Sequence, residues 1–319
     1  MSQHGADVES FPRHFDGKRF FNEDNSRAPG FRDLARWQLS SRPEPSPRFV
    51  DDVRPSKPPE RVTGSETRVT LVNHSTVLVQ RSGCHILTDP IWSERASPFT
   101  WAGPRRRRKP GVELEDLPRI DAVLLSHNHY DHLDVATLRR LAQRGGSQFV
   151  VPSGVGRLLQ SLDIGPIHEL DWGERVVIAG AEILSVPARH FSARGLFDRY
   201  RTLWCGYVMG GEGGSIYFAG DTAFGSHFSQ IRERCGAPRL ALLPIGAYEP
   251  QWFMSSVHMN PDEAVEAHRI LGAENSVAIH HGTFQLADEG LDAPRKRLRE
   301  CAAGESFVVL GNGQSMTLA

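Results

Sequence analysis

A short apolar run that passes directly into a histidine-rich loop constrains this chain more than any other feature. Residues 122–125 (Ala-Val-Leu-Leu) have the composition of a buried strand, and the next residues contain the pattern His-x-His-x-Asp-His. Zinc and similar divalent ions accept imidazole and carboxylate ligands. In an extended segment His127 and His129 point the same way, while Asp131 and His132 turn toward a neighbouring position. The stretch therefore predicts a metal centre that can hold two ions.

The alternative is a polar loop that is histidine-rich by chance, and the strand directly before the motif disfavours it. Three more ligand-type residues, His190, Asp221 and His280, follow apolar runs. Open sheets place functional groups at strand ends. Gly220 would let the backbone approach closely before Asp221. His281 competes with His280, but alternation along a strand places the two side chains on opposite faces.

These patterns resemble the metallo-β-lactamase superfamily of hydrolases, for which His-x-His-x-Asp-His after an apolar strand is the signature. Longer blocks resemble N-acyl-phosphatidylethanolamine-hydrolysing phospholipase D and its bacterial relatives. They are Leu87–Pro90, Ser126–Asp134, Pro187–His190, Phe218–Thr222, Pro244–Pro250, Trp252–Met254, Ala278–His280 and Gly282–Phe284. The Tyr-Glu-Pro-x-Trp-Phe-Met block at 248–254 is the part that indicates the subfamily, and the resemblance extends from about Arg68 to about Gly313.

The resemblance implies two zinc ions, or other divalent metals, held by seven ligands. These are His127, His129 and His190 for one ion, Asp131, His132 and His280 for the other, and Asp221 between them. A hydroxide held between the ions would attack the phosphorus of a phosphodiester, with Asp131 counted as catalytic because its ion holds the nucleophile. A histidine at the position of His258 lies beside the substrate phosphate in the resembling phospholipase. His258 is thus a second catalytic candidate, and a loop histidine that helps cap a helix is the alternative.

Further candidates surround this centre. His74, Asp89 and Asp134 could fix the metal-bound histidines from outside, although each could instead be a turn residue. Tyr248 is a candidate for substrate binding. So are Arg105 and Arg106, which belong to a run of five cations at 105–109 that suits an anionic head group or is a solvated loop. The family usually has Gly where Asn73 stands.

Alternating strands and helices predict an α/β fold, and the resemblance specifies a four-layer αββα sandwich. Apolar or β-branched runs predict strands at 69–72, 76–79, 84–88, 122–125, 149–151, 175–178, 182–186, 205–209, 215–219, 240–244, 277–279 and 307–310. Helices are expected at 135–143, 156–162, 228–235 and 261–271, with Asp134 and Asn260 as N-caps of the first and last. We expect one hydrolase domain at 68–319. An irregular, Pro-rich extension at 1–67 would pack on it or serve as a lid.

Composition narrows the classes of partner. The net charge is −1, so no whole-protein field attracts nucleic acid, and four cysteines without a C-x-x-C pair suggest neither a disulfide framework nor a thiolate zinc site. No apolar run approaches the length of a bilayer span. We expect a cytoplasmic protein with a small-molecule or lipid substrate, at most peripheral membrane contact and no nucleic-acid partner; a homodimer stays open.

The leading hypothesis is a zinc phosphodiesterase of the phospholipase D type that cleaves an N-acyl-phosphatidylethanolamine-like lipid. A lactonase, or another metal-dependent ester or phosphodiester hydrolase with a soluble substrate, is the alternative. RNA processing is disfavoured by the neutral charge and the lack of an added nucleic-acid module. A redox role is disfavoured because the di-iron relatives carry Glu where His129 stands.

Overall fold

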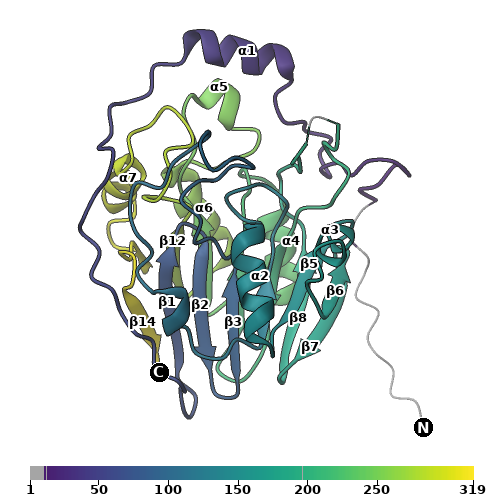
Figure 1. Ribbon diagram of the computed structural model, residues 1–319, viewed down its shortest axis with the longest axis vertical. Coiled ribbons are helices and arrows are strands. Elements are labelled where there is room, and N and C mark those ends of the chain that lie inside the picture. Colours follow the sequence, from purple (N-terminus) through teal and green to yellow (C-terminus); the bar gives the residue numbers. More distant parts are fainter. Residues whose placement is uncertain (1–10, 12, 196) are drawn as a thin grey trace.

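Two seven-stranded sheets form the centre of the molecule (Figure 1). The computed structural model describes residues 11, 13–195 and 197–319, so the first ten residues of the predicted N-terminal extension lie outside the described residues. The first sheet has the order β14-β1-β2-β3-β4-β5-β6. Its strands are β1 (Thr67–Asn73), β2 (Thr76–Arg81), β3 (Cys84–Thr88), β4 (Ala122–Leu124), β5 (Gln148–Pro152), β6 (Ile167–Leu170) and β14 (Ser315–Leu318).

The second sheet repeats the plan of the first, with the order β13-β12-β11-β10-β9-β8-β7. Its strands are β7 (Arg175–Ile178), β8 (Ala181–Val186), β9 (Gly206–Met209), β10 (Ile216–Phe218), β11 (Leu240–Pro244), β12 (Asn275–Ile279) and β13 (Phe307–Val308). In both sheets one half pairs antiparallel and the other half parallel, with the change at β3 and at β10. The carboxyl ends of the parallel strands point to the same edge of the molecule in Figure 1.

Helices cover the outer face of each sheet. The described helices are α1 (Phe31–Ser40), α2 (Val135–Arg144), α3 (Gly156–Gln160), α4 (His227–Cys235), α5 (Gln251–Met254), α6 (Pro261–Leu271) and α7 (Ala293–Cys301). On β4, Ala122 and Leu124 pack between the sheets, whereas Val123 faces Leu138 and Leu141 of α2. A strand buried on both faces needs an apolar residue at every position, which explains the continuous apolar run there. The prediction of a four-layer αββα sandwich is confirmed.

Local capping signals were reliable guides to two helix starts. The Asp134 carboxylate accepts a hydrogen bond from the backbone N–H of Ala136 at the start of α2. Asn260 and Glu263 form a reciprocal capping box at the start of α6, and Pro261 occupies its first turn. Both predicted N-caps are confirmed.

Several elements differ from the sequence-based expectations. Phe307–Leu310 is not the last strand, because the short segment β14, in which polar and apolar residues alternate, follows it and pairs antiparallel with β1. Strand β6 and the cationic helix α7 were not expected, since few of their residues are buried and no apolar period marks them. The segment 1–67 is not wholly irregular, since it contains α1, no residue of which is buried. No helix among the described residues is long and apolar enough to cross a bilayer.

Candidate metal centre

Strand ends from both sheets bring the predicted ligands together. The loop after β4 supplies His127, His129, Asp131 and His132, and segments after β8, β10 and β12 supply His190, Asp221 and His280. Gly220 has a φ of 61°, and a Cβ there would lie 2.5 Å from Cβ of Ser126. Only glycine fits a backbone that passes so close to the histidine loop. The close approach expected of Gly220 is therefore present.

Three histidines form the first group. The Nε2 atom of His127 lies 2.8 Å from Nδ1 of His129, and the Nε2 atom of His190 lies 3.3 Å from the same nitrogen. His127 and His190 are buried, and His129 lines an open cleft. Nitrogens at these separations can all reach one ion placed between them.

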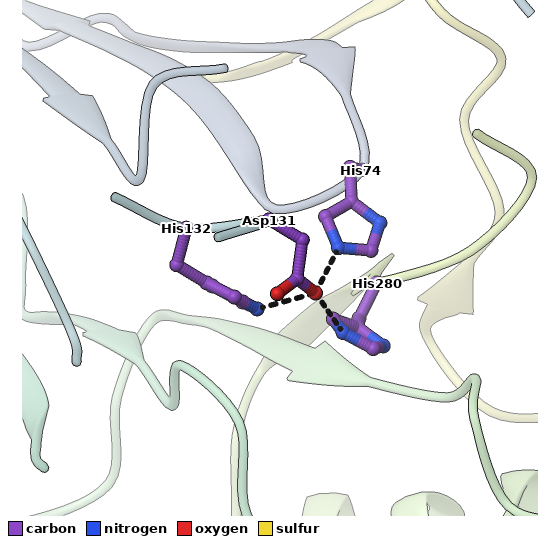
Figure 2. Close-up of side chains that lie close together, drawn as sticks. All are labelled: His74, Asp131, His132 and His280. Atoms are coloured by element: carbon purple, nitrogen blue, oxygen red, sulfur yellow. Dashed lines mark hydrogen bonds and ion pairs between the residues drawn. The ribbon is translucent and has the colours of Figure 1, made fainter. Parts of the chain in front are cut away.

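The second group surrounds the carboxylate of Asp131 (Figure 2). Its Oδ2 atom lies 3.3 Å from Nε2 of His132, 3.3 Å from Nε2 of His280 and 3.1 Å from Nε2 of His74. His281 does not join this group: its ring is buried on the other side of the strand end, with Nε2 3.2 Å from the carbonyl oxygen of Ala278. The alternation expected after β12 thus selects His280.

Asp221 lies between the two groups. Its Oδ2 atom is 3.0 Å from Nε2 of His132 and 3.1 Å from Nε2 of His280, and 3.9 Å from Nε2 of both His127 and His190. The buried Oδ1 atom of Asp221 has no hydrogen-bond partner among the described residues. Buried polar atoms are nearly always satisfied, so this oxygen fits a cation that it would bind. The position suits the bridging role predicted for Asp221.

Burial and charge prepare these side chains for metal binding. Burial holds the pKa of His127 and His190 well below the ordinary value and lowers the pKa of His129 to about 4. These rings are neutral near pH 7, which is the form that binds a metal. Burial opposes the ionisation of Asp221, yet the adjacent imidazoles of His132 and His280 hold its pKa well below the usual range. Burial opposes protonation of His280 and His132 too, but the Asp221 carboxylate raises the pKa of His280 to about 9 and, together with Asp131, holds the pKa of His132 well above its ordinary value. A metal would therefore displace a proton from these two rings. Imidazole and carboxylate donors together form a set that suits zinc.

Outer hydrogen bonds fix the orientation of the rings. The Nδ1 atom of His132 lies 2.6 Å from Oδ2 of Asp89, and Nδ1 of His190 lies 2.8 Å from the carbonyl oxygen of Val257. The Ser126 hydroxyl donates to Asp89 and lies 2.9 Å from Nδ1 of His127. A ring that donates its Nδ1–H outward presents the lone pair of Nε2 to the centre. The contacts of Asp89 and His74 fit the predicted outer roles.

Three other predictions are not supported by the structure. Asp134 touches no predicted ligand; besides capping α2, its carboxylate accepts from the backbone N–H groups of Trp92 and Ser93. Tyr248 lines a separate polar cavity of about 900 Å³ between the segment 44–47, α6 and α7. Tyr248 does not line the cleft at the predicted metal centre, whereas Phe253, five residues further along the same loop, does.

The arginine run also has a different role from the one predicted. Arg106 is 3% exposed, and its guanidinium donates to the carbonyl oxygen of Ile91 and to Oδ1 of Asn73. Arg108 is buried and pairs with Asp52 and Asp292. Arg105 is exposed, lies near Glu94 and is absent from the lining of the cleft at the centre. Arg106 is therefore a structural cation rather than part of an anion patch, because its donors are used within the protein.

An apolar cleft of about 340 Å³ leads to the centre. Its floor contains His129, Asp131, Asp221 and His258, and its walls are Pro29, Gly30, Phe31, Leu34 and Trp37 near or on α1, with Phe191, Arg199, Phe253, Met254, Val257 and Leu286. Sequence reasoning gave a lid at 1–67 as one of two alternatives, but it missed the helix α1 and the contribution of Arg199. The excess of aromatic residues in the N-terminal segment was the available signal for α1.

Comparison with known proteins identifies the family. A beta-lactamase superfamily domain matches residues 85–281, which include all seven predicted ligands. The chain belongs to this superfamily. An N-acyl-phosphatidylethanolamine-hydrolyzing phospholipase D from Caenorhabditis elegans is 43% identical over 243 residues, 72% of this chain and 68% of the relative. A mitochondrial protein of the same name from Saccharomyces cerevisiae is 34% identical over 71% of this chain and 50% of its own length.

A more distant relative has a name of the same reaction class, and a solved structure shares the fold. A metal-dependent hydrolase from Methanopyrus kandleri is 30% identical over 78% of this chain and 98% of its own. Among solved structures, the isothiocyanate hydrolase from Delia radicum gut bacteria superposes with a TM-score of 0.62 at 22% identity, covering 78% of this chain and 98% of that one. At that identity the likeness shows the fold alone. This β-lactamase-superfamily protein is a metal-dependent hydrolase related to the N-acyl-phosphatidylethanolamine phospholipases.

Proposed function

We propose that this protein is a phosphodiesterase of the phospholipase D type that binds two zinc ions and cleaves an N-acyl-phosphatidylethanolamine-like phospholipid. The observation that carries the proposal is the apolar cleft that ends on the His/Asp centre. A cleft with aromatic and aliphatic walls and a polar floor suits a substrate that joins an acyl chain to a phosphate. The relatives whose names specify this lipid support the same choice.

The donor groups divide into two sets that can each hold one ion. His127, His129 and His190 would hold the first, and Asp131, His132 and His280 the second, with Asp221 shared. When bound, a zinc pair supplies a hydroxide nucleophile near neutral pH and neutralises negative charge that develops on the phosphoryl oxygens. The carboxylates and rings contribute rigid positions, since outer hydrogen bonds already fix most of them.

In this proposal His258 acts on the phosphate. Its Nδ1 atom lies 3.9 Å from Oδ2 of Asp221 and has no hydrogen-bond partner among the described residues. Its ring is stacked 5.2 Å from that of His280 and lines the floor of the cleft. Burial lowers the pKa of His258 to about 4, so the neutral ring carries one N–H at pH 7. That N–H can donate to a phosphoryl oxygen as its charge develops.

One cation in the cleft wall favours an anionic substrate. Arg199 is the only Arg or Lys among the described residues that line this cleft. Its guanidinium lies 5.0 Å from the ring centre of Phe191, and one of its nitrogens donates to the carbonyl oxygen of Pro29. The buried Nε–H has no partner among the described residues. Arg199 is therefore a cation of the cleft wall, whereas Arg106 does not line the cleft.

The test is to incubate purified, metal-quantified protein with mixed micelles of N-acyl-phosphatidylethanolamine in ¹⁸O-labelled water. Hydrolysis at phosphorus yields phosphatidic acid and an N-acylethanolamine, with one ¹⁸O in the phosphate and none in the alcohol. Mass spectrometry of both products reads the outcome. A matched panel of soluble lactones and simple phosphodiesters covers the alternative. Turnover of a lactone without turnover of any phosphodiester would overturn the proposal.

A further inference from the structure

His74 enters the centre from the opposite side to the histidine loop. It occupies the two-residue turn between Asn73 of β1 and Thr76 of β2, and its backbone has a φ of 48°. The backbone N–H of His74 donates to Oγ1 of Thr283, and its carbonyl oxygen accepts from the N–H of His280. The turn of the first sheet is therefore tied to the segment that follows β12 of the second.

The ring of His74 has a fixed orientation. Its centroid lies 4.2 Å from that of His280, and Phe284 contacts it edge-on at 5.4 Å. The side chain is 1% exposed, and Nε2 points to Oδ2 of Asp131 at 3.1 Å (Figure 2). Only one nitrogen of the ring thus meets a charged group.

The partners of each ring distinguish His74 from the predicted ligands. His132 and His190 place their Nδ1 against fixed acceptors, which leaves Nε2 to bind a metal. Nδ1 of His280 and Nδ1 of His74 are both buried without a partner among the described residues. His280 differs because its Nε2 also lies 3.1 Å from Oδ2 of the bridging Asp221, whereas the ion pairs of His74 among the described residues involve Asp131 alone. A proton on Nδ1 of His74 would be unsatisfied, whereas a proton on its Nε2 is accepted by the Asp131 carboxylate. His74 therefore donates to Asp131 and has no lone pair to offer at that position.

We propose that His74 is a positioning residue that holds the Asp131 carboxylate between His132 and His280, and thereby sets the affinity of one metal position only. This inference rests on the two-metal centre proposed above. In the first group, His127, His129 and His190 contact one another, and no hydrogen bond links them to His74 among the described residues. Loss of the His74 donor should weaken the metal held by Asp131 and leave the other nearly unchanged.

The test compares His74→Ala, His74→Gln and His268→Ala with the wild-type protein. Glutamine keeps an N–H donor at about the reach of the imidazole Nε2. His268 is a buried histidine on α6 that bonds Ser276 and stands apart from the centre, so its variant measures the general effect of removing a buried ring. Zinc per chain is measured by mass spectrometry after gel filtration, and the two affinities by titration against a chelator.

We expect His74→Ala to lower the affinity for the zinc ion held by Asp131 by about 10- to 100-fold, the usual effect of losing an outer partner of a metal ligand. His74→Gln should recover most of that loss, and His268→Ala should bind two ions like the wild type. If His74→Ala does not fold, the glutamine variant decides the question by itself. Loss of the second ion from His74→Gln as well would overturn the proposal, because His74 would then be a ligand.

If His74→Ala binds two zinc ions with wild-type affinity, the inference is also overturned, because His74 would then have no effect on either metal position. The failure of the proposed function gives a different result, since the wild-type protein would then bind fewer than two ions or would leave the phosphodiester intact. The metal titration and the product analysis therefore separate the two failures.

Discussion

The floor and one wall of the same cleft are built in opposite ways. On the floor, Asp131, Asp221 and the surrounding histidines are almost fully buried, and each contacts several others. On the wall, α1 has no buried residue, and Figure 1 shows it above α5, outside the layered sheets. Its attachment includes the stacking of Trp37 on Phe253 at 4.9 Å and a hydrogen bond from the Trp37 indole to Asp288.

This difference suggests a division of tasks, with catalysis on the floor and substrate selection at the wall. A dense floor fixed from outside, as His132 is by Asp89, can hold reacting groups within the narrow tolerances that catalysis needs. For a wall held by a few side chains we expect lower local stability than for the floor. We therefore expect substitutions in the floor to reduce kcat or metal content, and substitutions in the wall to change KM.

The largest effect is expected for the floor. Asp131→Asn replaces a carboxylate ligand by a neutral amide, and activity should fall by roughly 10²-fold or more, since loss of an outer partner alone costs up to about that much. His281→Ala removes the buried histidine next to the predicted ligand His280, and its ring faces away from the centre. This variant should lose far less activity. The measurement is kcat/KM together with zinc content; similar losses in both variants would show that the wrong histidine has been assigned.

A smaller but still large effect is expected at His258. His258→Ala should keep both metals and the fold and lower kcat by about 10²-fold, at the low end for a lost catalytic hydrogen-bonding or acid–base group. The neutral ring of His258 donates a hydrogen bond to a phosphoryl oxygen and does not protonate the leaving alcohol. We therefore expect similar losses of kcat for diesters with good and with poor leaving alcohols. Rates on a series of leaving groups measure this. A loss confined to poor leaving groups would assign proton donation to His258 instead.

The wall should give a modest effect confined to KM. Leu34→Ser removes an aliphatic side chain from the cleft lining, and it should raise KM for the lipid about fivefold, equivalent to ~1 kcal/mol of apolar contact. Leu39→Ser is the matched control, because Leu39 is on the same helix, 90% exposed and not part of the lining. Equal changes in the two variants would indicate that α1 acts as a general apolar surface rather than as a wall.

The smallest effects on activity are expected in the arginine run. Arg106→Gln should reduce the free energy of unfolding by about 1–3 kcal/mol, because buried acceptors such as the carbonyl oxygen of Ile91 lose their donor. Arg105→Gln should change stability by less than about 0.5 kcal/mol. Denaturant unfolding measures both, with KM on anionic vesicles measured in parallel. A raised KM for Arg105→Gln would restore this residue as part of an anion-binding surface.

Local sequence determined the parts of the centre that lie close together in the chain. The spacing of His127, His129, Asp131 and His132 after an apolar strand was sufficient to predict a metal centre, since strand geometry fixes where such residues point. The single positions His190, Asp221 and His280 each follow an apolar run, but they became ligand candidates only together with the His-x-His-x-Asp-His motif and the family resemblance. The alternation of strands and helices likewise predicted the layered α/β fold.

The tertiary structure alone decided which polar groups face the centre and which are used elsewhere. Asp134 and Arg106 are of residue types that often bind metals or anions. Their partners are instead backbone groups of the loop at 91–93, and no local sequence pattern predicts that pairing. The converse holds for Arg199 and the residues of α1, whose place in the cleft depends on contacts with segments more than 150 residues away. Strand β14 is too short for its Ser-Met-Thr-Leu alternation to identify it, and it becomes a strand because β1 offers an unpaired edge. Short-range geometry is encoded in neighbouring residues, whereas these assignments depend on which distant surfaces the folded sheets bring together.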